Sequence, residues 1–135
     1  MEQKVTIEEL YTLLSAKLEN MKYLVKFYIG KAKDVEKRGH DHEEKDGMPN
    51  TVTIAYGDAR IISEGEKYLI MKFKDSDKLC KNINIGGGNP NADKLYISYS
   101  CDMTKTESIY ELNDDDIMWS VKYHLIKKNI YYETI

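Results

Sequence analysis

The sequence is poor in the residues that mark special architectures. Its 135 residues include two cysteines, two prolines, two phenylalanines and one tryptophan. Cys80 and Cys101 are too few for a disulfide framework, so we expect both thiols to be free and to pack as small apolar groups. No apolar run approaches the roughly 18–20 residues that a membrane span needs, and the first residues lack signal-peptide features. These absences predict a cytoplasmic protein with no membrane contact.

Charge is abundant and slightly acidic. Lys and Arg number 20 against 23 Asp and Glu, for a formal net charge of −3. Because phosphate binding relies on Lys and Arg, this balance argues against direct nucleic-acid binding and favours a basic protein partner. With 41% hydrophobic and 32% charged residues, the chain is expected to form one globular domain over residues 1–135.

Both ends of the chain carry helix signals. Thr6 and Glu9 have capping-box spacing, and residues 7–20 then place their apolar side chains on one helical face. Residues 117–128 follow a run of aspartates and end in two lysines, which suits the helix dipole at both ends. A short β-prone tail, residues 130–135, comes after them. We therefore expect an N-terminal helix, and a C-terminal helix followed by a strand.

Between these helices the pattern predicts strands joined by turns. Residues 66–74 form the clearest of them, because their side chains alternate along the segment. Gly57 and Gly65 mark two of the turns. The expected strands are residues 23–29, 51–56, 59–63, 66–74, 79–85 and 93–101, with 106–112 as a further candidate.

One segment, residues 31–50, interrupts this series. It is highly charged and contains Gly39, Gly47 and Pro49, so we expect a long exposed excursion with at most a helical turn at 32–37. The predicted fold is α+β. It is a single domain with a curved, mainly antiparallel sheet of about five to seven strands, covered on one face by the N-terminal and C-terminal helices.

The same segment holds the only dense cluster of potential metal ligands. His40, His42 and Glu43 are the candidates, and zinc or nickel accepts such groups. Nothing in the pattern predicts the rigidity that would aim two rings at one ion, and a solvated charged loop is the favoured interpretation. The glycine-rich residues 86–91 precede a strand and lack the Lys of a phosphate loop, so we interpret them as a wide turn. No nucleophile elbow is present. We therefore predict no cofactor and no enzymatic activity.

The expected terminal helix has apolar side chains on two sides. One stripe contains Ile117, Met118, Val121 and Leu125, and the other contains Trp119, Tyr123 and Ile126. Burial between the sheet and the first helix explains both stripes. A contact surface for a partner around Trp119 and Tyr123 is the alternative, since Trp and Tyr are common interface anchors.

The order of these elements resembles the first-described superfamily of immunity proteins of bacterial polymorphic toxin and contact-dependent growth inhibition systems. The segments that carry the resemblance are residues 6–18, 23–29, 66–73, 95–99 and 114–135. The resemblance implies a protein that binds and neutralises a cognate toxin domain, of nuclease or deaminase type, and that catalyses nothing. It leaves the oligomeric state open.

For such a protein we expect partner contacts at strand ends, in turns and on the terminal helix. The residues predicted to bind the partner are Asp75, Asp77, Asp93, Tyr96, Trp119 and Tyr123. Three other interpretations stay open. The first is an inhibitor, encoded by a phage or mobile element, of a host defence protein. The second is a small metal-dependent hydrolase that uses residues 40–44, and the third is a structural subunit.

Overall fold

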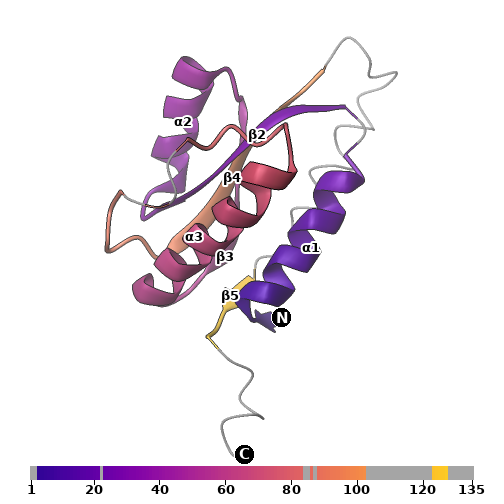
Figure 1. Ribbon diagram of the computed structural model, residues 1–135. Coiled ribbons are helices and arrows are strands. Elements are labelled where there is room, and N and C mark those ends of the chain that lie inside the picture. The colour runs from indigo at the N-terminus through magenta and orange to yellow at the C-terminus, as the bar shows by residue number, and fades with distance from the viewer. Residues whose placement is uncertain (1–2, 22, 84–85, 87, 103–122, 128–135) are drawn as a thin grey trace, which may run out of the picture.

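The computed structural model describes residues 3–21, 23–83, 86, 88–102 and 123–127 of the chain. Over these residues the chain forms three helices and one five-stranded sheet (Figure 1). The elements are, in order, β1 (Gln3–Val5), α1 (Ile7–Glu19), β2 (Leu24–Ala32), α2 (Val35–Asp46), β3 (Asn50–Tyr56), α3 (Ala59–Ser76), β4 (Lys94–Cys101) and β5 (Tyr123–Leu125).

The sheet has the strand order β1-β5-β3-β4-β2. Strand β4 pairs antiparallel with β2 and with β3, whereas β5 runs parallel to both β1 and β3. The predicted α+β class is confirmed, but the sheet is mixed rather than mainly antiparallel. Strand β2 lies at one edge, which places it next to the candidate site described below.

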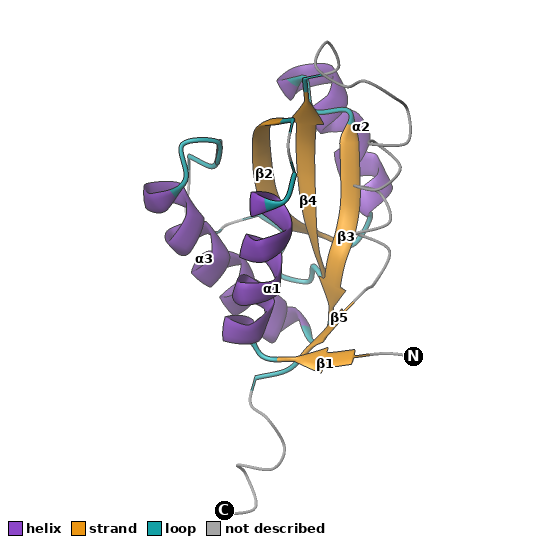
Figure 2. Ribbon diagram, turned by 90° about the vertical axis from the view of Figure 1, so that its right-hand side faces the viewer, coloured by secondary structure: helices purple, strands orange, loops and turns teal. Residues whose placement is uncertain are grey.

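The helices form layers on both faces of the sheet. Figure 2 shows α1 and α3 on one face and α2 on the other. Alternate residues of β2 and β4 point toward α1 and α3 and build the main core with the buried leucines of α1. The expectation that helices cover one face only is therefore wrong, because it did not include α2.

Helix α1 forms as predicted. The Glu9 backbone N–H donates to Thr6 Oγ1 at 3.2 Å, and the Thr6 N–H donates to Glu9 Oε1 at 3.2 Å, which completes the capping box. Leu10, Leu14 and Leu18 are buried at helical spacing. The predicted strands at 23–29, 51–56 and 93–101 are likewise confirmed as β2, β3 and β4.

The exposed excursion expected at 31–50 is wrong. Strand β2 continues to Ala32, and α2 then begins after Asp34, whose side chain accepts the Lys37 N–H at 3.0 Å. Gly47 ends the helix at φ 65°, in the left-handed conformation that favours glycine. The helix has a single buried residue, His42, so it lacks the apolar stripe on which the sequence pattern relies.

The strands expected at 59–63 and 66–74 are also wrong, because both belong to the single helix α3. Asp58 caps it by accepting the Arg60 N–H at 2.9 Å. The nearly continuous apolar run from Tyr68 to Phe73 fits a period of two as well as a period of 3.6. Gly65 is no turn. A side chain there would come within 2.8 Å of the Leu125 side chain, so the glycine lets α3 pack closely against β5.

Residues 79–82 cover the free edge of β2 instead of forming the strand expected at 79–85. Phe27 N–H donates to the Leu79 carbonyl at 2.9 Å. The carboxamide of Asn82 then continues the pattern, accepting the Ile29 N–H at 2.9 Å and donating to the Ile29 carbonyl at 2.8 Å. The edge of the sheet is thereby protected against pairing with other chains.

Strand β5 corrects part of the expected terminal helix. Tyr123 and Leu125, which the helical pattern put on opposite sides, lie on the same buried face of a strand. The first part of the expected helix, residues 117–122 with Trp119, lies outside the described residues. The same is true of the strands expected at 106–112 and 130–135. Cys80 and Cys101 are not joined in a disulfide, and each is partly buried against the core. None of the described helices combines the length and apolar character that crossing a membrane requires.

Candidate functional site

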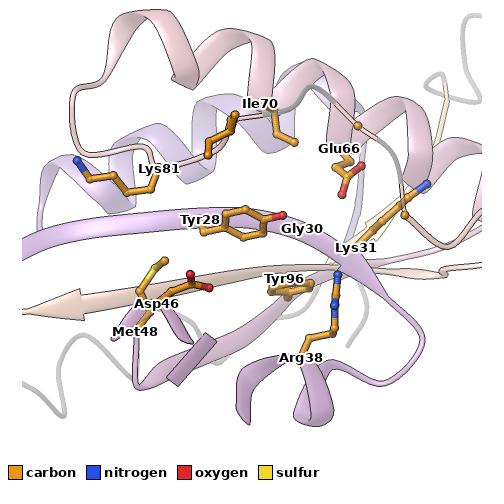
Figure 3. Close-up of a pocket in the computed structure, with 13 residues that line it drawn as sticks. Tyr28, Gly30, Lys31, Arg38, Asp46, Met48, Glu66, Ile70, Lys81 and Tyr96 are labelled. Atoms are coloured by element: carbon orange, nitrogen blue, oxygen red, sulfur yellow. The ribbon is translucent and has the colours of Figure 1, made fainter. Parts of the chain in front are cut away.

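A cavity of about 380 Å³ lies at the edge of the sheet beside β2. Its walls come from elements on both faces of the sheet. Helix α3 contributes Glu66 and Ile70, and the α2 side contributes Arg38, Asp46 and Met48 (Figure 3). Strands β2 and β4 and the segment after α3 complete the lining with Tyr28, Gly30, Lys31, Tyr96, Lys81, Ile83, Gly86 and Gly88.

Glu66 is the most unusual group in this lining. It occupies a helical position between Ile62 and Ile70 on the buried side of α3, and only 6% of its surface is exposed. Its Oε1 is buried and has no hydrogen-bond partner among the described residues. Burial raises the pKa of Glu66, and the opposing effects of Lys31, Lys67 and Arg38 do not cancel that rise. Such a buried, perturbed acid in a cavity is typical of a functional site.

On the α2 side, three side chains form a hydrogen-bonded chain. His42 Nδ1 lies 2.7 Å from Asp46 Oδ2, and Nε2 lies 2.9 Å from the Tyr96 hydroxyl. A neutral imidazole satisfies both contacts when Nδ1–H donates to the carboxylate and Nε2 accepts the phenol O–H. The Tyr28 ring packs on the same imidazole with 4.6 Å between ring centroids. This arrangement fixes both tyrosines that line the cavity.

Gly30 and Tyr96 face each other in the register between β2 and β4. A Cβ at Gly30 would overlap the phenol of Tyr96, so the ring fits there only because the position has no side chain. Tyr96 is completely buried, and burial raises the pKa of its hydroxyl. Burial also raises the pKa of Tyr28, assisted by the negative charge of Glu66.

The basic side chains of the lining are directed to different partners. Lys31 Nζ donates to Ser63 Oγ at 2.7 Å. Arg38 has its nearest carboxylate in Asp41, at a long 3.9 Å. In Figure 3 the ammonium groups of Lys31 and Lys81 lie at opposite ends of the cavity, while the carboxylate of Glu66 points into it. Glu66 therefore faces the cavity without a directly bonded cation.

One apolar side chain stands exposed at the mouth of the cavity. Ile83 is 80% exposed and lines it. Met71, on α3, is 58% exposed but does not line the cavity. Lys74 Nζ donates to the Ile83 carbonyl at 2.7 Å and ties this segment to the same end of α3 as Met71. The mouth thus combines an apolar rim with a polar interior.

The acids predicted to bind a partner are not brought together. Asp75 is exposed at the end of α3, and Asp77 caps that end while accepting the Leu79 N–H at 2.9 Å. Asp93 pairs with Lys94 at 3.0 Å, and its carbonyl accepts the Gly57 N–H just before α3 begins. The 18 residues of α3 span roughly 27 Å, so Asp93 lies at the opposite end of the molecule.

The aromatic residues of the predicted partner surface are placed differently. Tyr96 is buried beneath α2, and Tyr123 is buried in β5, where the ammonium of Lys17 lies 5.3 Å from its ring centroid. Trp119 lies outside the described residues. Neither tyrosine has the exposed surface that a direct contact with a protein needs, although Tyr96 lines the cavity.

The metal candidates of residues 40–44 point apart. His40 and His42 are two positions apart on α2, which separates them by about 200° around the helix axis. His42 is directed inward to Tyr96, whereas His40 and Glu43 line a shallow hollow between α2 and β3. Across the described part of the chain, no group of three or more His, Cys, Asp or Glu side chains is placed to hold a metal ion.

The sequence pattern missed Glu66, Tyr28 and Arg38 as site residues. A signal for Glu66 exists, because it interrupts an otherwise apolar helical stripe formed by Ile62, Leu69, Ile70 and Phe73. That signal is visible only when residues 59–76 are taken as one helix. No comparable pattern marks Tyr28 or Arg38, which meet the cavity through the packing of α2 on the sheet.

Comparison with known proteins assigns no family to the chain. It matches no family model, no curated protein and no solved structure. Its function is therefore inferred from the cavity and the surface around it.

Proposed function

We propose that this protein acts by binding a partner protein at the mouth of the cavity and inhibiting it. The observation that carries the proposal is Ile83, a large aliphatic side chain that is 80% exposed at the rim of a polar cavity. Met71 adds a second exposed apolar group at that end of α3. Apolar anchors beside pockets with a few polar groups are typical of protein interfaces.

The partner that we propose is a toxin domain of nuclease or deaminase type, as the family resemblance implies. A domain that acts on nucleic acid carries basic side chains to bind phosphates. A net charge of −3 on the present chain complements such a partner and accelerates their encounter.

The geometry of the histidines favours binding over catalysis. Both ring nitrogens of His42 are engaged, one by Asp46 and one by Tyr96, so the imidazole is held in a structural role. His40 points away from it, which gives no support to a metal-dependent hydrolase built on residues 40–44.

Co-expression with the neighbouring gene product tests the proposal. We expect the gene upstream to encode a large secreted protein whose C-terminal domain is toxic, and this chain to form a stable one-to-one complex with that domain. Ile83→Asp should weaken the complex at least about tenfold, because it places a charge in the apolar contact. Val25→Asp changes another exposed aliphatic residue, on β2, and serves as the matched control. A complex that tolerates Ile83→Asp as well as Val25→Asp would overturn the proposal.

A further inference from the structure

We infer that the cavity receives an arginine side chain of the partner protein, and that Glu66 is the acceptor for its guanidinium group. The inference rests on the proposed function, because it names the group through which the partner engages this site. Glu66 thereby has a direct role in binding. The proposed contact at Ile83 does not by itself involve Glu66.

One carboxylate oxygen of Glu66, Oε1, is buried without a hydrogen-bond partner among the described residues. Buried polar atoms in folded proteins almost always have hydrogen-bond partners, and each exception calls for a reason. Within the described residues nothing donates to Oε1, and no basic nitrogen lies within 4.0 Å of the carboxylate. The residues around Glu66 on this face of α3 are apolar, so a leucine at position 66 would pack equally well. A donor supplied from outside explains why a carboxylate is kept here.

The basic residues around Glu66 do not compensate for the burial of its carboxylate. The charges of Lys31, Lys67 and Arg38 and a hydrogen bond from the Lys31 backbone all favour the charged form of Glu66, yet burial outweighs them and its pKa remains raised. Lys31 is held by Ser63, and Arg38 has Asp41 as its nearest acid. A cation bonded directly to the carboxylate would supply the compensation that these distant charges do not, since charge-assisted bonds are the strong ones.

The size and the walls of the cavity favour arginine over lysine. A volume of about 380 Å³ is at the small end of ligand pockets, which suits one long side chain rather than a whole cofactor. The Tyr28 ring and Ile70 offer walls on which an alkyl stem and a flat cation can pack. Guanidinium is planar and more weakly hydrated than ammonium, so its burial costs less.

The test uses the full chain and a small probe, so that no partner is needed. N-acetyl-arginine methylamide is titrated into isotope-labelled protein, and the backbone amide signals of Tyr28, Gly30 and Glu66 are followed. The lysine and citrulline analogues are the matched probes, because citrulline keeps the shape and several N–H donors but has no charge. We expect saturable shifts with the arginine probe and an affinity at least about tenfold lower for citrulline.

Three variants make the result specific. Glu66→Gln should abolish saturable binding of the arginine probe, whereas Glu64→Gln, which neutralises an exposed acid on the same helix, should leave it unchanged. Tyr28→Leu removes the aromatic wall and should also weaken binding, which keeps the test valid if Glu66→Gln is poorly folded. Equal binding of arginine and citrulline, or unchanged binding by Glu66→Gln, would overturn the inference.

Comparing Glu66→Gln with Ile83→Asp separates this inference from the proposed function. If the partner complex is lost with Ile83→Asp but unaffected by Glu66→Gln, the arginine site is wrong and the proposed function stands. If the arginine probe binds through Glu66 but no partner complex forms with the neighbouring toxic domain, the proposed function fails and the guanidinium site stands as a site for another basic ligand.

Discussion

Tyr96 occupies the space that a side chain at Gly30 would fill. The two residues are paired across β2 and β4, and the phenol then reaches His42 at 2.9 Å. This contact links the sheet to α2 and forms one side of the cavity. Any substitution that displaces the ring therefore disturbs both the packing of α2 and the site.

Gly30→Ala should destabilise the protein by about 1–3 kcal/mol, because the added methyl overlaps a buried ring. Urea unfolding monitored by circular dichroism gives the value. The same substitution made in a Tyr96→Leu background should cost clearly less, because the clashing atoms are absent. Equal costs in both backgrounds would mean that strain elsewhere, and not the phenol, is responsible.

His42→Ala should lower the free energy of unfolding by about 2 kcal/mol or more, since it removes a buried ring and its hydrogen bond to the Tyr96 hydroxyl. His40→Ala is the matched control on the same helix. His40 is exposed, so its removal should change stability by no more than about 0.5 kcal/mol. Similar losses for the two variants would contradict the structural role of His42.

Asn82→Ala should both destabilise the protein and increase its tendency to aggregate. The carboxamide makes two hydrogen bonds to Ile29, and its loss leaves that part of the edge strand open, at a cost of about 1–3 kcal/mol. Unfolding curves and light scattering at several concentrations measure the two effects. Lys81→Ala, which changes an exposed neighbour, should show neither effect.

Glu66 should make stability depend on pH in a defined direction. Its pKa in the folded protein is raised above the ordinary 4.5, mainly by burial and against Lys31, Lys67 and Arg38, with Tyr28 and Tyr96 also nearby. The folded state thus holds this proton more tightly than the unfolded chain. Glu66 therefore destabilises the folded state least at pH values below 4.5. The free energy of unfolding that it costs grows as the pH rises through the folded pKa.

Glu66→Gln removes this titration. The melting temperature of the variant relative to wild type should therefore increase from about pH 4 to about pH 8, as measured by thermal unfolding at several pH values. Glu64→Gln, on an exposed position of the same helix, should show no such trend. A Glu66→Gln difference that is constant with pH would show that Glu66 does not titrate differently on folding.

The elements predicted correctly from sequence are those whose local signals agree with their surroundings. For α1, a capping box and a single apolar stripe point to the same helix. For β4, Leu95 and Ile97 alternate with Tyr96 and Ser98, so the strand is recognisable even though both its faces are buried. In these segments local propensity and tertiary packing favour the same structure.

The elements that escaped prediction depend on contacts distant in sequence. Helix α2 buries only His42, so its position becomes apparent only once Tyr28 and Tyr96 are placed beneath it. Strand β5 has three residues and is defined by parallel pairing with β1 and β3. The cavity has the same origin. It joins α2, α3 and β2, and two of these three elements were not recognised or were assigned to strands.

Isothermal titration calorimetry with wild type and Glu66→Gln tests the central claim most directly. The ligand is the toxic C-terminal domain that we expect the neighbouring gene to encode. We predict a one-to-one complex that Glu66→Gln weakens at least about tenfold, while Glu64→Gln, at an exposed position of the same helix, leaves the affinity unchanged at moderate salt. A complex of equal affinity for wild type and Glu66→Gln, or no complex with the wild-type protein, would contradict it.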